Sequence, residues 1–144
     1  MLKALSILGY LAMVAGTIGA LLTRSLFSAS PIVIAAQVAA AGVLLWARIT
    51  FGRRSFHFAG NPTAGGLVTT GPYRFIRHPI YASFCLFVWA GLIAHCSVGA
   101  CGLGLLVLAG ALVRVFCEER LVRERYPEYG EYAARTKRLV PFLF

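Results

Sequence analysis

Apolar residues along this chain are gathered into four blocks, which short stretches of polar or charged residues separate. The blocks cover residues 2–22, 31–47, 80–96 and 98–116. An α-helix needs roughly 20 apolar residues to cross the hydrocarbon core of a membrane. The first block meets this length, and the second does so if its helix begins near Leu26. The third and fourth blocks are shorter, and only Ser97 stands between them.

We therefore expect four transmembrane helices, the last two of which form a tight hairpin. Their expected bounds are 2–22, 26–47, 79–96 and 98–116. The first block is interpreted as a retained helix rather than a cleaved signal peptide, because it is longer than a signal's apolar region and no clean cleavage site follows. In total 59% of the residues are hydrophobic, too many for an ordinary soluble domain. A helix satisfies its own backbone hydrogen bonds in lipid. The expected fold class is all-α: one integral membrane bundle over residues 1–144, with a cytoplasmic loop and C-terminal amphipathic helices.

The basic residues predict how the helices are oriented in the membrane. The formal net charge is +9. With four helices, both termini and the middle loop share one side of the membrane, and that side is strongly basic. Its lysine and arginine residues are Lys3, Arg48, Arg53, Arg54, Arg74, Arg77, Arg120, Arg123, Arg125, Arg135, Lys137 and Arg138. Because cytoplasmic loops are enriched in these residues, we expect this side to be cytoplasmic. The charge favours anionic lipid headgroups as partners over nucleic acid, since the arginines flank the helices and form no separate basic domain.

The acidic residues are unusual in their placement. All five are glutamates, and all lie between Glu118 and Glu131. Glu119 with Arg123, and Glu131 with Arg135, have the i,i+4 spacing of helical ion pairs. Pro127 suits the first turn of a short helix. The tyrosines that follow, at positions 126, 129 and 132, are interpreted as an aromatic belt at the membrane surface.

Two polar clusters flank the predicted hairpin. One is "YRFIRHPIY" (73–81), at the start of the third helix and behind the glycine-rich stretch 60–71, which we expect to be irregular. The other is "RVFCEE" (114–119), at the end of the fourth. Arg114 and Glu118 share a helix face. Because a hairpin brings these ends together, the sequence predicts a small polar pocket at the membrane surface. Arg77 is interpreted as a determinant of topology.

The segment "LVTTGPYRFIRHPIY", followed by Arg-x-x-x-Glu-Glu and then "YPEYGEYAART", resembles the isoprenylcysteine carboxyl methyltransferase family. More broadly it is similar to integral-membrane methyltransferases that include phospholipid N-methyltransferases. The resemblance covers roughly residues 65–142, over half of the chain, and the combined pattern is specific where "RHP" alone is not. One departure is Ser83, where the family often has glycine.

The resemblance implies S-adenosylmethionine as cofactor, bound by the regions 65–81 and 114–142. Its cofactor-binding positions fall on Gly66, Leu67, Val68, Tyr73, His78, Pro79, Ile80, Tyr81 and Glu118. Glu119 either joins this set or pairs with Arg123 on a solvated face. The family's substrate-contacting arginine falls on Arg114, so Arg114 and Glu118 are the candidate catalytic residues.

The resulting hypothesis is a membrane methyltransferase with a lipophilic or amphiphilic acceptor. A prenylcysteine-like carboxylate is favoured, and a phospholipid amine or a small thiol are the alternatives. A non-enzymatic alternative is a four-span transporter subunit, although no ionisable group stands at the centre of a predicted helix to couple ions. A non-catalytic relative is a third possibility. We expect no metal site, because the four cysteines form no CxxC pattern and the histidines lack ligand spacing.

Overall fold

The computed structural model describes residues 1–52 and 66–141. Within these residues it consists of helices and contains no strand, only an isolated bridge between Ile76 and Lys137. The elements are α1 (Leu2–Leu22), α2 (Pro31–Phe51), the 3₁₀-helix η2 (Gly71–Arg74), α3 (Pro79–His95), α4 (Val98–Arg125) and α5 (Tyr129–Arg135). The predicted all-α class is confirmed.

The structure corrects the predicted start of the second helix. α2 begins at Pro31 rather than near Leu26 and extends to Phe51. Proline lacks an N–H and suits a first turn, whereas inside a helix it breaks a hydrogen bond. Ser30 before it is extended, as residues preceding proline tend to be. The amide of Leu26 instead donates to the carbonyl of Ala20, so the loop folds back on the end of α1.

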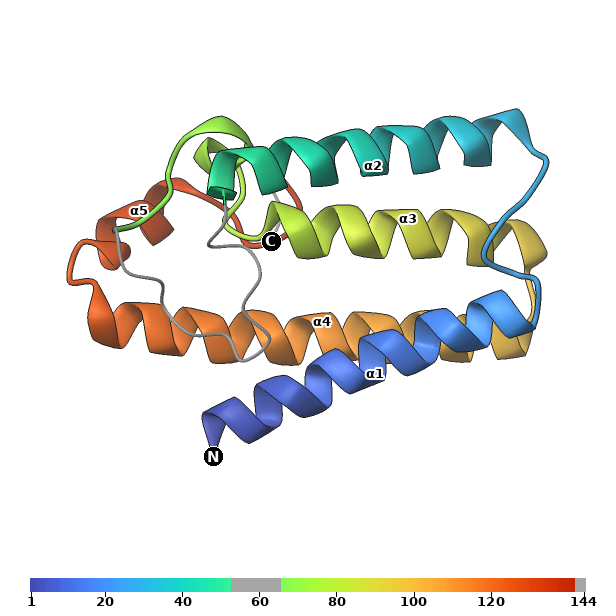
Figure 1. Ribbon diagram of the computed structural model, residues 1–144, viewed down its shortest axis with the longest axis horizontal. Helices are drawn as coiled ribbons and strands as arrows, with labels where there is room; N and C mark the ends of the chain where they lie inside the picture. Colours follow the sequence, from blue (N-terminus) through green and yellow to red (C-terminus); the bar gives the residue numbers. More distant parts are fainter. Residues whose placement is uncertain (53–65, 142–144) are drawn as a thin grey trace.

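The four long helices pack as two pairs. α1 lies along α4, and α2 lies along α3 (Figure 1). α3 and α4 form the expected hairpin. Cys96 ends α3 in the left-handed conformation, and the Ser97 side chain caps α4 by accepting a hydrogen bond from the amide of Ala100. The hairpin places the start of α3 and the charged end of α4 at the same end of the bundle, where α5 also lies (Figure 1).

A pair of glycines lets α1 and α4 come into close contact. A Cβ atom built on Gly110 would lie 2.5 Å from the carbonyl oxygen of Gly9, and one built on Gly9 would lie 2.8 Å from that of Gly110. No larger residue fits between the two backbones, a packing mode common among membrane helices. Gly104 similarly accommodates the ring of Trp89, while Gly99 and Gly102 face open space.

Among the described residues, α1, α2 and α4 are long and apolar enough to cross a membrane, and α3 is apolar but shorter. α1 and α2 expose many large apolar side chains, which suits contact with lipid. α4 continues to Arg125, beyond the predicted end at residue 116. Glu118 and Glu119 therefore lie on a regular helix, which fixes the directions of their side chains. Pro127 lies just before α5, not in its first turn.

Candidate functional site

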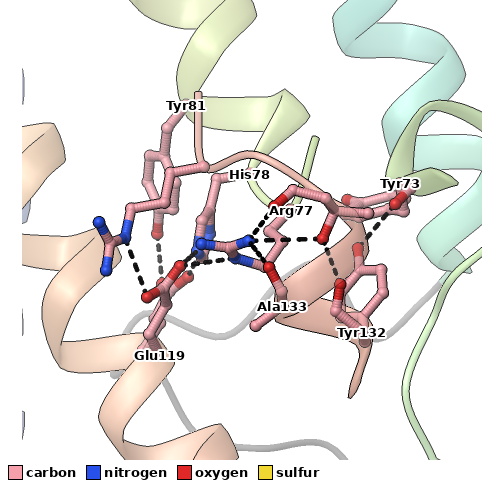
Figure 2. A network of polar contacts seen from close by, with 10 residues as sticks. Tyr73, Arg77, His78, Tyr81, Glu119, Tyr132 and Ala133 are labelled. Atoms are coloured by element: carbon pink, nitrogen blue, oxygen red, sulfur yellow. Dashed lines mark hydrogen bonds and ion pairs between the residues drawn. The ribbon is translucent and has the colours of Figure 1, made fainter. Parts of the chain in front are cut away.

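The first turn of α3 carries one half of the site. His78 is the residue that caps this helix, and Pro79 is its first residue, as predicted. His78 and Tyr81 lie near one another, with ring centroids 6.0 Å apart. Figure 2 shows that both side chains are directed toward Glu119 of α4. The hairpin therefore does bring the two polar clusters together.

Arg114, Glu118 and Tyr81 form a connected group between α4 and α3. Nη2 of Arg114 lies 3.1 Å from Oε1 of Glu118, which confirms the pair expected from their spacing. Nε of Arg114 donates to the Tyr81 hydroxyl at 2.7 Å, and this hydroxyl in turn donates to Oε1 of Glu118. Arg114 is only 4% exposed. A buried guanidinium with these partners is a fixed positive group rather than a side chain reaching for the membrane surface.

α1 also contributes to the surroundings of Arg114, which the sequence did not indicate. Nη1 of Arg114 donates to the backbone carbonyl of Ser6 at 3.3 Å. The ring of Tyr10 lies 5.5 Å from the guanidinium carbon, and the ring of Tyr81 lies 5.6 Å from it. The close contact at Gly9 brings this part of α1 within reach. A carbonyl acceptor leaves no trace in a sequence, so no motif in α1 could have revealed it.

Glu119 is buried, and its predicted pairing is wrong. It is 5% exposed and accepts from Nε of Arg77 at 2.9 Å and from Nε of Arg138 at 3.1 Å. It forms no ion pair with Arg123, whose guanidinium lies over the ring of Tyr129 instead. The helix turns Glu119 inward, where two cations compensate its charge. The other predicted pair, Glu131 with Arg135, does form at 3.3 Å.

Arg77 is part of this network, beyond any role in topology. Its Nη1 donates to the carbonyl oxygens of Ala133 and Thr136 (Figure 2). The adjacent backbone is paired with the C-terminal segment: Arg77 N donates to Lys137 O at 2.7 Å, and His78 N donates to Arg138 O at 3.0 Å. The sequence did not indicate this role of Arg77, because many arginines flank the predicted helices and topology alone explains an arginine at this position.

The environment of His78 fits a polar ligand. Its Nδ1 lies 3.8 Å from Oε2 of Glu118, and its Nε2 lies 3.4 Å from Oε1 of Glu119. Neither contact has hydrogen-bond geometry, and the buried Nε2 has no hydrogen-bond partner among the described residues. The Glu118 side chain keeps 21% of its surface exposed. The partly exposed carboxylate of Glu118 and the adjacent imidazole of His78 suit a ligand with cationic and hydrogen-bonding groups. S-adenosylmethionine has both kinds of group.

Tyr73 lies beside α5 instead of in the Arg114 group. It is 5% exposed, its ring lies 5.4 Å from that of Phe51, and its carbonyl accepts from the Tyr132 hydroxyl at 2.7 Å. Tyr132 is therefore a structural contact and not only an aromatic belt residue. Burial raises the pKa of both hydroxyls, Tyr73 and Tyr132, so both stay protonated to a higher pH than a free tyrosine does.

The remaining candidate residues make no polar contact with Arg114, Glu118 or Tyr81 among the described residues. Gly66 is exposed with a φ of +83° and open space beside it, and Leu67 and Val68 are half-buried in the irregular segment before η2. Pro79 is buried and Ile80 is half-buried at the start of α3. Some of the predicted features lie outside the described residues. These are Arg53 and Arg54, most of the glycine-rich stretch 60–71, and residues 65 and 142, the first and last residues of the expected cofactor regions.

Comparison with known proteins gives a consistent picture. The family model described as phospholipid methyltransferase matches residues 32–129, from α2 to the start of α5. The chain is 36% identical over 80 residues to the nickel-cobalt-cadmium resistance protein NccN of Alcaligenes xylosoxydans xylosoxydans, covering 54% of the chain and 37% of that protein. It is 35% identical over 81 residues to the cobalt-zinc-cadmium resistance protein CzcN of Cupriavidus metallidurans, covering 54% of the chain and 36% of that protein.

The matched part thus spans little more than a third of the length of these curated relatives. No solved structure matches the chain. Among the described residues, no group of three or more histidine, cysteine or acidic side chains could hold a metal ion. The family match covers well over half of the chain, including both halves of the site. The protein therefore belongs to the phospholipid methyltransferase family, which is related to the isoprenylcysteine carboxyl methyltransferases.

Proposed function

We propose that the protein is a membrane methyltransferase that uses S-adenosylmethionine and acts on an amphiphilic acceptor. The observation that carries this proposal is the meeting of Glu118, His78 and Tyr81 at the end of the α3–α4 hairpin. The family match supports the reaction class. When bound, the cofactor supplies a methyl group on a positively charged sulfur.

Each half of the site has a role in binding this cofactor. Glu118 is the anionic group that faces its positive charge, and the His78 ring lies beside it, with Nδ1 3.8 Å from Oε2 of Glu118, where it can contact a polar group of the ligand. Ile80, which is half-buried at the start of α3, provides apolar surface near them, whereas Tyr73 and Pro79 are buried and support the site from within. The open space beside Gly66 allows a ligand to approach the main chain closely, and Leu67 and Val68 follow it in the same irregular segment.

Arg114 is the group proposed to orient the acceptor. A planar guanidinium binds a carboxylate with two parallel hydrogen bonds. A carboxylate needs no general base at neutral pH, so orientation and removal of water are what the site has to supply. Arg114 is buried and contacts both Glu118 and Tyr81. To bind the acceptor, its guanidinium has to release one of these two contacts and form hydrogen bonds to the acceptor in its place. When a cationic ligand binds Glu118, it weakens the ion pair between Glu118 and Arg114, and this favours the release of Arg114.

A phospholipid amine is the second candidate acceptor, because the matching family is described by phospholipid methylation. An amine must lose a proton before or during methylation. His78 and Glu118 are the groups of the site that can accept this proton, and Arg114 then binds the phosphate of the lipid. A thiol acceptor and a transport function have no observation of their own in the structure to favour them.

Transfer of a labelled methyl group tests this proposal. The purified protein in lipid nanodiscs is given methyl-labelled S-adenosylmethionine with a prenylcysteine-like acid, phosphatidylethanolamine or a long-chain thiol. We expect label in a base-labile ester of the acid. Arg114→Lys should lower the rate by roughly tenfold or more, since a hydrogen bond to a charged group contributes about 1.5–3 kcal/mol. Arg120→Lys, at a side chain 71% exposed, is the matched control. Absence of transfer to every acceptor by folded protein would refute the proposal.

A further inference from the structure

The two consecutive glutamates at the end of α4 have different surroundings. The Glu118 side chain is 21% exposed, and its Oε2 lies 3.8 Å from Nδ1 of His78. The Glu119 side chain is 6% exposed, and each of its oxygens accepts from a guanidinium, Arg77 on one and Arg138 on the other. Glu118 can meet a ligand, whereas Glu119 faces only protein groups in the described part of the chain.

Glu119 lies where three segments meet. Figure 2 shows Arg77, from the loop before α3, beside Glu119 of α4. Arg138 comes from the segment after α5 and also donates to Glu119. The loop 75–78 and the segment 136–139 are also joined through their backbones, since Lys137 N donates to Phe75 O at 3.3 Å and Arg77 N donates to Lys137 O. The side chain of Arg77 adds its contacts to Ala133 O and Thr136 O.

These contacts also determine the position of His78. Its backbone amide donates to Arg138 O at 3.0 Å, and its Nε2 lies 3.4 Å from Glu119. We propose that Glu119 is a positioning residue, which holds the C-terminal segment 136–139 against the loop 75–78 and thereby fixes the ring of His78 beside Glu118. This inference rests on the proposed function only where it makes His78 a cofactor ligand.

The charges explain why one residue has this effect. Without Glu119, the guanidiniums of Arg77 and Arg138 would lose the carboxylate that both of them contact at a partly buried position. The segment 136–139 has one isolated bridge and few backbone bonds to retain it. We therefore expect it to separate from the loop when the charge of Glu119 is removed, as weakly held segments open locally before the rest of a protein.

The test compares Glu119→Gln and Arg138→Gln with the control Arg135→Gln, whose side chain is 76% exposed and pairs only with Glu131. Tryptic cleavage after Lys137 is measured in nanodiscs and normalised to the rate in denatured protein. Cleavage should accelerate roughly tenfold in the first two variants, equal to a loss of about 1.4 kcal/mol of protection, and remain unchanged in the control. Arg138→Lys should restore part of the protection, because it returns the charge without the planar guanidinium.

Nitrogen NMR of the His78 ring, assigned with His78→Gln, gives a second readout. Its signals should shift in Glu119→Gln and Arg138→Gln but not in Arg135→Gln. Calorimetry with S-adenosylhomocysteine adds a third, with affinity reduced in the same two variants. If Glu119→Gln loses affinity while the segment stays protected and the His78 signals stay unchanged, Glu119 contacts the ligand directly and the inference is wrong. If wild type binds no S-adenosylhomocysteine, the proposed function fails, while proteolysis and NMR still decide the role of Glu119.

Discussion

At the scale of single residues, the Tyr81 hydroxyl connects the cation and the anion of the site. It accepts from Nε of Arg114 at 2.7 Å and donates to Oε1 of Glu118. Both of its partners are charged, and such hydrogen bonds are roughly twice as strong as neutral ones. The same hydroxyl keeps Arg114 directed toward α3 and so determines how the guanidinium is presented.

Removal of this hydroxyl should be costly in both stability and binding. Tyr81→Phe is expected to lower the free energy of unfolding by about 1.5–3 kcal/mol, the contribution of hydrogen bonds to charged groups. Ser83→Ala is the matched control on α3, because its hydroxyl donates only to the carbonyls of Pro79 and Ile80 within its own helix. Denaturant unfolding in detergent measures both. Equal effects of the two substitutions would contradict this account of the Tyr81 hydroxyl.

At the scale of helices, α1 matters because its backbone lies against α4. The pair Gly9 and Gly110 allows this contact, and the contact places Ser6 O and the Tyr10 ring beside Arg114. A change at the glycine pair should therefore affect both the bundle and the site, since a Cβ atom on Gly9 would also lie 3.1 Å from Cγ of Arg114.

Gly110→Ala is expected to reduce stability by about 1–3 kcal/mol, the usual cost of overpacking, because the added Cβ lies 2.5 Å from Gly9 O. Gly102→Ala on the same helix meets nothing within 4 Å and should be neutral or slightly stabilising, given the higher helix propensity of alanine. Thermal unfolding of the two variants in the same detergent checks this. A Gly110→Ala protein as stable as Gly102→Ala would mean that the helices are farther apart than described.

The sequence predicted the parts of these elements that local patterns determine. The bounds of α1, the α3–α4 hairpin and the pair of Arg114 with Glu118 follow from apolar length and helical spacing. The partners of Glu119 could not be predicted in this way. Arg77 and Arg138 are 42 and 19 residues away from it in the chain, and the position of each arginine near the membrane was already explained by topology.

At the scale of the whole molecule, the charged groups and the apolar surfaces are separated. The start of α3, the end of α4, η2 and α5 lie at one end of the bundle, and the α3–α4 turn lies at the other (Figure 1). We propose that the charged end is cytoplasmic, as the distribution of lysine and arginine along the sequence indicates. In that orientation a soluble cofactor arrives from the cytoplasm and a lipid-like acceptor arrives through the membrane.

Native cysteines can test this orientation. Cys96 at the α3–α4 turn and Cys101 near the start of α4 are exposed free thiols, whereas Cys117 is buried on α4. In right-side-out vesicles, a membrane-impermeant maleimide should label wild type at Cys96. The Arg125→Cys variant in a Cys96→Ser and Cys101→Ser background should react only after the vesicles are made permeable. The reverse pattern would place the charged end outside the cell.

The central claim is that the two ends of the α3–α4 hairpin form one cofactor site, and binding of S-adenosylhomocysteine tests it most directly. Calorimetry on detergent-purified protein should show saturable binding by wild type, weakened roughly tenfold or more in both His78→Ala and Glu118→Gln, as expected when a charged or buried polar contact is lost. Glu124→Gln, at a side chain 62% exposed, should bind like wild type. Folded wild-type protein that shows no saturable binding would contradict the account.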